Sequence, residues 1–317
     1  MLGKTANGLF WMSRYLERAE NTARFVETGQ RTALTRLGGM DEDWSTVLNC
    51  TATLGAFQST GRDLTKDAAI DWLLRAPENP SSVLSSVEAA RRNARLVRTA
   101  ITGEVWEAIN AAYITTRRIL GAEVTERDLP MVLHQIQQDS AMVRGMTHGT
   151  MLRNDIYNFQ RLGTLLERAD NTTRILSARH TALVPPEAGT PMAEQAPTEH
   201  VIWESMLRLL SARGGFRMEY GAEAEHHELA HFLILDPRMP RSIGFTVRKV
   251  RDNLGYLENR AGESSASKGM ADRLVADYLE TDIPAIHSRG LQTYLRGILT
   301  GLDALSGQIE RDFRFYE

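Results

Sequence analysis

The strongest constraint on the fold is a nonapeptide that occurs twice in the chain. Residues 16–24 read LERAENTAR and residues 166–174 read LERADNTTR, 150 positions later, with seven of the nine letters identical. One difference, Glu20 against Asp170, preserves the charge, and the other places Thr173 where the first copy has Ala23. So close an internal match predicts a duplicated structural unit.

Each copy of the nonapeptide belongs to a segment whose pattern predicts a long helix, over residues 8–36 and 154–181. On a helical wheel with about 100° per residue, the first helix has an apolar face and a polar face centred on Glu17. The polar face comprises Ser13, Arg14, Glu17, Glu20, Asn21, Arg24, Thr28 and Arg31. Both signs of charge therefore recur along one side of this helix.

The similarity between the two halves extends beyond the nonapeptide. Trp203 matches Trp44, and a Pro-x-x-Pro turn occurs in each half. A serine is expected to cap the helix that follows each turn, Ser81 or Ser82 in the first half and Ser242 in the second. Strand signals are nearly absent. The sequence predicts an all-α fold: one domain built as an internally duplicated helical bundle. Its two similar halves, residues 8–151 and 152–317, are expected to pack about a pseudo-twofold axis, with a mobile loop at residues 184–199.

Composition excludes several classes of function. The net charge of −3 over 317 residues gives no general attraction to nucleic acid, and no apolar stretch approaches the length of a membrane span. Cys50 is the only cysteine, so no internal disulfide can form, which fits a cytoplasmic protein. The chain has neither a GxxxxGK[ST] motif nor a GxGxxG motif after a strand. We therefore expect no cofactor, and no nucleotide binding by this chain alone.

The chain resembles the Alpha-E family, a group of bacterial all-helical proteins named for a recurring Glu-Arg pair. The pairs here are Glu17-Arg18 and Glu167-Arg168, and the segments 6–21, 79–83 and 89–95 also resemble the family. The family has no settled activity. The resemblance implies a genomic context instead, because its genes typically adjoin or are fused to those of circularly permuted ATP-grasp proteins. Transglutaminase-like proteins often lie nearby. This context implies ATP-dependent amide or peptide-bond formation, with the helical protein as partner or second enzyme.

Three interpretations of the paired polar faces remain open. Such a face can be solvated and stabilised by pairs within the helix, it can form a buried network between the halves, or it can line a shared cleft. For a cleft, arginines suit carboxylate or phosphate, glutamates suit an amine, and asparagines fix orientation. The set fits an amino-acid or peptide-like substrate, or the ligase itself. The predicted binding residues are Arg14, Glu17, Arg18, Glu20, Asn21, Arg24, Glu167, Arg168, Asp170, Asn171 and Arg174.

Two alternatives would make the chain an enzyme in its own right. In the first, Glu17 or Glu167 acts as acid or base and the neighbouring arginines bind an anion. In the second, the sequence HELAH at residues 227–231 is a zinc-peptidase signature, with His227 and His231 as ligands and Glu228 as base. A polar helix face explains the same letters, and no third ligand stands out downstream.

Overall fold

The computed structural model describes residues 3–35, 40–184, 192–221, 224–262 and 264–316. Within these ranges the chain forms fifteen α-helices and no strand, which confirms the predicted all-α class. It divides into two compact units: unit 1 is residues 1–167 with 313–317, and unit 2 is residues 168–312. The division falls inside helix α8 (Asp155–Ala178), whereas the predicted halves meet at residues 151 and 152. The duplication and its pseudo-twofold axis remain predictions.

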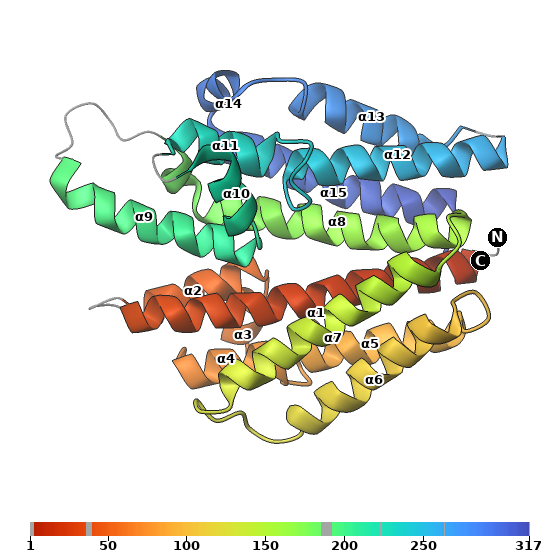
Figure 1. The fold of residues 1–317 in the computed structure, drawn as a ribbon, viewed down its shortest axis with the longest axis horizontal. Helices are drawn as coiled ribbons and strands as arrows, with labels where there is room; N and C mark the ends of the chain where they lie inside the picture. Colours follow the sequence, from red (N-terminus) through yellow and green to blue (C-terminus); the bar gives the residue numbers. More distant parts are fainter. Residues whose placement is uncertain (1–2, 36–39, 185–191, 222–223, 263, 317) are drawn as a thin grey trace. The chain divides into compact units, whose positions relative to one another are not determined.

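Unit 1 is built around its first helix. Helix α1 lies against α5, α7, α2 and α4, and α6 packs against both α5 and α7 (Figure 1). The helices of this unit are α1 (Gly3–Thr35), α2 (Met40–Cys50), α3 (Leu54–Gln58), α4 (Lys66–Leu74), α5 (Val83–Leu96), α6 (Gly103–Ile119), α7 (Leu129–Thr150) and the start of α8. Because several helices surround α1, its polar face is enclosed as well as its apolar face.

Local capping explains where the helices of unit 1 begin. The Ser82 side chain accepts a hydrogen bond from the backbone N–H of Ser85 at the start of α5, as predicted. Thr102 caps α6 in the same way. The side chain of Asn154 accepts from the backbone N–H groups of Ile156 and Tyr157, so α8 begins immediately after α7 ends. This short connection brings α8 back alongside the other helices that form the candidate site.

Unit 2 contains the remainder of α8 and eight further helical segments. They are η1 (His180–Leu183), α9 (Met192–Leu209), α10 (Arg213–Tyr220), α11 (His226–Ile234), α12 (Ile243–Ala261), α13 (Ala266–Tyr278), α14 (Ile283–Arg289) and α15 (Leu291–Asp312). Helix α13 packs against both α12 and α15, and α11 packs against η1, α12 and α14. The predicted cap is again present, since Ser242 accepts from the backbone N–H of Phe245 at the start of α12.

Two segments differ from the prediction. Residues 192–199 belong to α9 although the Pro-rich composition predicted a loop there; alanine, glutamate and glutamine favour helix strongly enough to outweigh the proline. The rest of that loop, residues 185–191, lies outside the described residues. The sequence also predicts that Gly38-Gly39 ends the first long helix, and this pair lies outside the described residues as well. The sequence predicts a connector over residues 55–66, but residues 55–58 form part of the short helix α3. None of the described helices is both long and apolar enough to cross a membrane.

Candidate functional site

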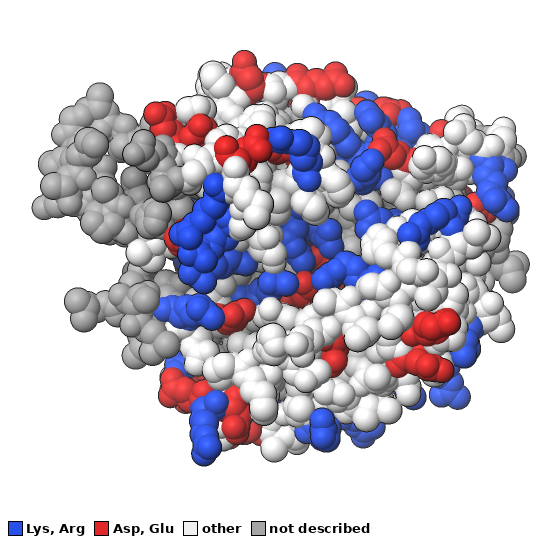
Figure 2. Space-filling model, viewed as in Figure 1, with Lys and Arg blue, Asp and Glu red and all other residues white. Residues whose placement is uncertain are grey.

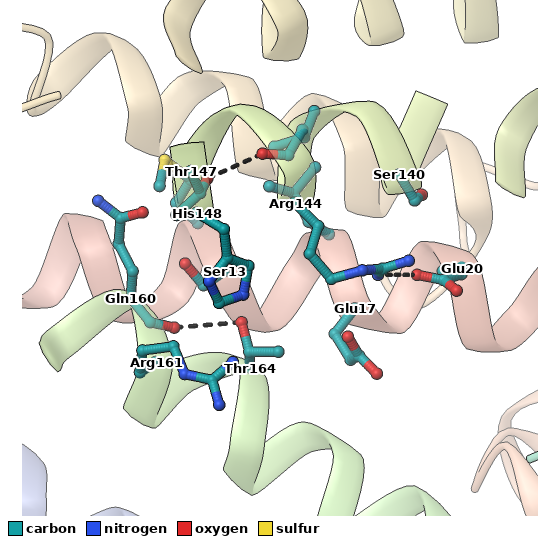
Figure 3. Close-up of a pocket in the computed structure, with 13 residues that line it drawn as sticks. Ser13, Glu17, Glu20, Ser140, Arg144, Thr147, His148, Gln160, Arg161 and Thr164 are labelled. Atoms are coloured by element: carbon teal, nitrogen blue, oxygen red, sulfur yellow. Dashed lines mark hydrogen bonds and ion pairs between the residues drawn. The ribbon is translucent and has the colours of Figure 1, made fainter. Parts of the chain in front are cut away.

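A pocket in unit 1 lies where α1, α7 and the first turns of α8 meet (Figure 3). Its polar lining comes from all three helices. The side chains are Ser13, Glu17 and Glu20 of α1, Ser140, Arg144, Thr147 and His148 of α7, and Gln160, Arg161 and Thr164 of α8. Met12, Leu16 and Val143 supply the apolar part. Its cavity volume is about 50 Å³, room for roughly three or four water molecules.

Glu20 lies at one end of this pocket and connects α1 to α7. Arg144 extends from α7 and donates from Nη1 to Oε2 of Glu20 at 2.6 Å, as Figure 3 shows. The other oxygen of Glu20 accepts from Nη2 of Arg24, one turn along α1, at 2.8 Å. Glu20 is only 1% exposed. A buried carboxylate needs such paired donors to offset its desolvation, and the two guanidinium groups supply them.

Gln160 is the most unusual residue in the pocket. It is 2% exposed, and neither its side-chain oxygen nor its side-chain nitrogen has a hydrogen-bond partner. The nearby hydroxyl groups of Thr147 and Thr164 donate back into their own helices and do not donate to this amide. Leaving a buried polar group unpaired costs about 1–3 kcal/mol. A side chain of this kind that lines a cavity is suited to a polar ligand that supplies both a donor and an acceptor.

Two further side chains complete the pocket. Ser13 is buried on α1 and lines the pocket. His148 lies at the more open side, where its Nδ1 is 2.9 Å from the hydroxyl of Tyr157 and the two rings meet edge to face. The guanidinium of Arg153 lies 4.0 Å from the centre of the Tyr157 ring. This contact fixes the tyrosine, and the tyrosine in turn orients the histidine.

Glu167 has a different environment from Glu17, its counterpart in the first nonapeptide. Arg18 donates to both oxygens of Glu167, at 2.6 and 3.0 Å, and Arg14 donates to Oε2 at 2.9 Å. Burial alone would raise the pKa of this carboxyl, but the guanidinium groups of Arg18 and Arg14 lower it to about 2. Glu167 is therefore a fixed anion that ties α8 to α1, and it does not line the pocket.

Most of the predicted residues of the first nonapeptide are buried, which excludes a fully solvated face. Glu17, Glu20 and Asn21 are 3%, 1% and 4% exposed, and the two glutamates line the pocket. The arginines of this segment carry the ion pairs to Glu20 and Glu167. A buried network and a pocket thus occur side by side along α1, where the sequence presented them as alternatives.

The predicted residues after Glu167 belong to unit 2. Arg168 is buried and donates to the backbone carbonyl of Pro240 at 3.3 Å, and Thr172 donates to that of Arg241 at 2.9 Å. Both contacts attach α8 to the turn before α12. Asp170 and Arg174 form a pair one turn apart at 2.7 Å, and Asn171 is half-buried. In unit 2 these residues have structural contacts.

The HExxH segment lies on α11, where its glutamate has a local role. Glu228 accepts from the backbone N–H of Glu225 at 2.8 Å and so forms a capping box at the start of this helix. Nδ1 of His231 is 3.4 Å from the hydroxyl of Tyr220, and His227 is largely exposed beside Glu225. In the described part of the chain no group of three or more His, Cys, Asp or Glu residues could hold a metal ion. The zinc site remains a prediction.

Sequence reasoning missed every polar residue that α7 and α8 contribute to the pocket: Ser140, Arg144, Thr147, His148, Gln160, Arg161 and Thr164. A signal for some of them was present. Arg144 and His148 are four residues apart and therefore share one face of α7, and Gln160 and Thr164 stand in the same relation on α8. Nothing in the sequence indicates that these two faces meet beside the first nonapeptide, because only tertiary packing brings α7 and α8 to α1.

Comparison with known proteins places the chain in a family. The chain is 24% identical over 324 residues to an uncharacterised protein of Mycobacterium bovis and to uncharacterised proteins of two Mycobacterium tuberculosis strains. The match covers 95% of this chain but only 35% of each of those proteins. No solved structure matches the chain. The family model named Alpha-E, described as a predicted alpha-helical domain with a conserved ER motif, matches residues 1–313. The chain therefore belongs to the Alpha-E family.

Proposed function

We propose that the pocket between α1, α7 and α8 binds the charged head of an amino acid or a peptide terminus. In this proposal the chain holds that substrate for an ATP-dependent amide ligase of the circularly permuted ATP-grasp class. The observation that carries the proposal is Gln160, a residue of the pocket lining whose buried side-chain amide has both its donor and its acceptor unpaired. A ligand with an ammonium and a carboxylate group supplies a partner for each.

The charges of the pocket fit a zwitterion better than a polyanion. Two carboxylates, Glu17 and Glu20, and two guanidiniums, Arg144 and Arg161, line the same cavity. In this arrangement the arginines attract the ligand carboxylate and Glu17 attracts the ammonium group. Glu20 contributes less, because its oxygens already accept from Arg24 and Arg144. A phosphate or nucleotide would meet two buried negative charges, which disfavours it.

The size of the pocket limits what can enter. A cavity of about 50 Å³ accommodates a group the size of roughly three or four water molecules. The ammonium, α-carbon and carboxylate of an amino acid are of this size, whereas a nucleobase or a sugar is not. We therefore propose that the head group of the substrate is buried and that the rest of the substrate extends toward the open side near His148.

The ligase part of the proposal is supported by resemblance and by chain length. The family resemblance implies a neighbouring circularly permuted ATP-grasp protein and, less directly, a transglutaminase-like protein. The chain spans 35% of the length of its mycobacterial relatives, so those proteins contain other segments in which further activity can reside. Activation of a carboxylate by ATP would then come from the partner, and this chain would present the acceptor.

An enzyme that uses the nonapeptide glutamates is the alternative proposal. Glu167 suits it poorly, because a carboxylate whose pKa is lowered to about 2 is a weak base at neutral pH. Glu17 lines the pocket and is the better candidate. Turnover by the purified chain without a partner, abolished by Glu17→Gln, would favour this alternative.

The decisive variant for the binding proposal is Gln160→Met, which keeps the shape of the side chain and removes its polar atoms. Thermal unfolding of the full chain is measured with each of the standard L-amino acids and with glycylglycine. We expect at least one ligand to raise the melting temperature of the wild type, since saturation at 100 times Kd stabilises by about 2.7 kcal/mol. The variant should lose this response and yet be more stable without ligand by about 1–3 kcal/mol, because an unpaired buried amide is removed.

A matched control is Gln138→Met, the same substitution at an exposed position of α7, which should change neither quantity. Loss of stability in Gln160→Met, with no ligand response in the wild type, would contradict the binding site.

The ligase step is tested separately by adding the chain to a purified circularly permuted ATP-grasp protein of the same organism. ADP release that depends on the amino acid should need the wild-type chain and fall with Gln160→Met.

A further inference from the structure

Helices α5 and α6 carry a row of alternating arginine and aromatic side chains on the surface of unit 1. The guanidinium of Arg98 lies 5.5 Å from the centre of the Trp106 ring, and that of Arg91 lies 5.9 Å from the same ring. Arg91 also lies 4.5 Å from the Tyr113 ring, and Arg117 lies 6.0 Å from it. These five side chains form a continuous stack, which we call the arginine ladder. Figure 2 shows positively charged side chains at the lower edge of this view, where Figure 1 places α6.

The positive charge of the arginine ladder is not neutralised by ion pairs with neighbouring carboxylates among the described residues. Six arginines lie on or next to these two helices: Arg91, Arg92, Arg95, Arg98, Arg117 and Arg118. None of the six forms an ion pair with any carboxylate that the structure describes. Their hydrogen bonds to side chains are to neutral groups, from Arg91 to Asn110 at 2.8 Å and from Arg117 to Tyr113 at 2.9 Å.

Stacking prepares these arginines for binding. A guanidinium that lies over an aromatic ring has a fixed plane, and its N–H groups remain at the edge of the stack. Less side-chain entropy is then lost when a carboxylate is bound by two parallel hydrogen bonds. Arginine, tryptophan and tyrosine are also the residues that most often dominate the energy of protein interfaces. The ladder therefore has both the charge and the preorganisation of a docking surface.

We propose that the arginine ladder docks an acidic segment of a partner protein that also carries apolar side chains. Two exposed apolar residues support a protein partner: Leu96 follows Arg95 and is 79% exposed, and Ile114 is 57% exposed. Ile114 follows Asn110 by four residues and so shares its face of α6. This surface is separate from the pocket. The proposed partner of the surface is a protein, whereas the proposed ligand of the pocket is a small molecule.

A nucleic acid is a poorer match to the same surface. Guanidinium groups already lie over the rings of Trp106 and Tyr113, so a base that stacked on the occupied ring faces would have to displace them. Glu88, Glu104 and Glu107 lie on the same two helices and interrupt the positive charge that a phosphate backbone would follow. Separate carboxylates on a folded or extended protein segment can bind between these glutamates.

Fluorescence anisotropy with the full-length chain tests the proposal. The probe is a fluorescein-labelled peptide of Glu-Glu-Leu repeats, and labelled oligo-dT serves as a second polyanion. We expect the peptide to bind and the double variant Arg91→Gln with Arg98→Gln to weaken binding by about tenfold or more, as the loss of interface anchors does. Replacing both by lysine should weaken binding by an intermediate amount, because the charge remains and the planar stack is lost.

The matched control is Arg273→Gln, an exposed arginine on α13, which should change peptide binding less than about twofold. If circular dichroism shows that the double variant is unfolded, Arg98→Gln alone serves, because this side chain is exposed and makes no hydrogen bond to described residues. Peptide binding that is absent, or unchanged by the ladder variants, would overturn the proposal. Tighter binding of oligo-dT, lost in the same variants, would overturn it in favour of a nucleic-acid partner.

Discussion

Glu17 and Glu167 occupy the same position of the repeated nonapeptide and yet have different surroundings. Glu17 lines a pocket, whereas Glu167 is enclosed by the guanidinium groups of Arg14 and Arg18. Both arginines also lie over aromatic rings of α1, Arg14 at 5.0 Å from Trp11 and Arg18 at 5.6 Å from Tyr15. Arg18 of the first copy, together with Arg14 two residues before that copy, therefore holds the glutamate of the second copy.

Replacing Glu167 by glutamine should destabilise the protein in a pH-dependent way. Removing one member of a buried ion pair costs about 3–5 kcal/mol at neutral pH. The pKa of Glu167 falls from 4.5 to about 2 on folding, so its stabilisation is complete above the unfolded pKa and is lost as the pH falls through the folded one. We expect the wild type to lose about 3 kcal/mol through this group between pH 5 and 2, a loss that the variant should not show.

Urea denaturation of both proteins across this pH range measures the difference. Asp170→Asn is the control, because its pair with Arg174 is partly exposed and lies within α8, and such pairs contribute about 0.3–0.5 kcal/mol. A constant difference between wild type and Glu167→Gln from pH 7 to pH 2 would contradict the proposed ion-pair stabilisation.

These residues also show how far the sequence could predict the site. The helical wheel placed Glu17, Arg18 and Glu20 on a polar helix face, because side-chain direction follows from the period of the helix alone. It could not show that Arg144 binds Glu20, or that Gln160 lines the same cavity, because those contacts depend on the distance between helices. A wheel gives the direction of a side chain but not its partner.

At the level of the elements, a glycine allows the close approach of α8 to α1. A Cβ atom at Gly163 of α8 would lie 2.1 Å from the backbone carbonyl oxygen of Phe10 in α1. The two backbones can therefore meet at this point only in the absence of a side chain. The crossing lies next to Gln160 and Thr164, so it also determines the width of the pocket.

Gly163→Ala should move α8 away from α1 and destabilise the protein by about 1–3 kcal/mol, the usual cost of overpacking. The pocket should widen, and any ligand response found for the wild type should weaken. Gly145→Ala is the matched control, because its added methyl group on α7 would contact nothing within 4 Å. That control should stabilise the helix by about 0.5–1 kcal/mol. Equal denaturation midpoints for the two variants would show that the close crossing is not required.

Helix positions were predicted well where capping and periodicity agree, and less well elsewhere. The serine caps at 82 and 242 are local, since each side chain bonds to a backbone group three residues later, and both are confirmed. The short helix α3 was missed because a helix of five residues has almost no period to detect. The start of α9 was missed because proline was given more weight than the surrounding helix-forming residues.

At the level of the whole molecule, the two compact units do not correspond to the two halves that the repeated motif predicts. The repeated motif predicts halves that divide near residue 151, but the first compact unit extends to Glu167 and includes residues 313–317 from the other end of the chain. Those last residues pack within unit 1. The Phe315 ring lies 5.4 Å from that of Phe10 and 6.3 Å from that of Phe159, and its carbonyl accepts from the Asn7 side chain. The repeat pattern contains no information about such a return.

Phe315 should therefore stabilise the beginning of the chain. It is 1% exposed, and truncation of a buried phenylalanine to alanine costs about 3–5 kcal/mol. We expect Phe315→Ala to increase hydrogen exchange most in the first turns of α1, because the ring of Phe10 loses its aromatic partner there. Tyr316→Ala is the adjacent control, since Tyr316 is 76% exposed and its loss should cost less than about 0.5 kcal/mol. Unchanged exchange in α1 of the Phe315 variant would show that the C-terminal residues do not contribute to the stability of unit 1.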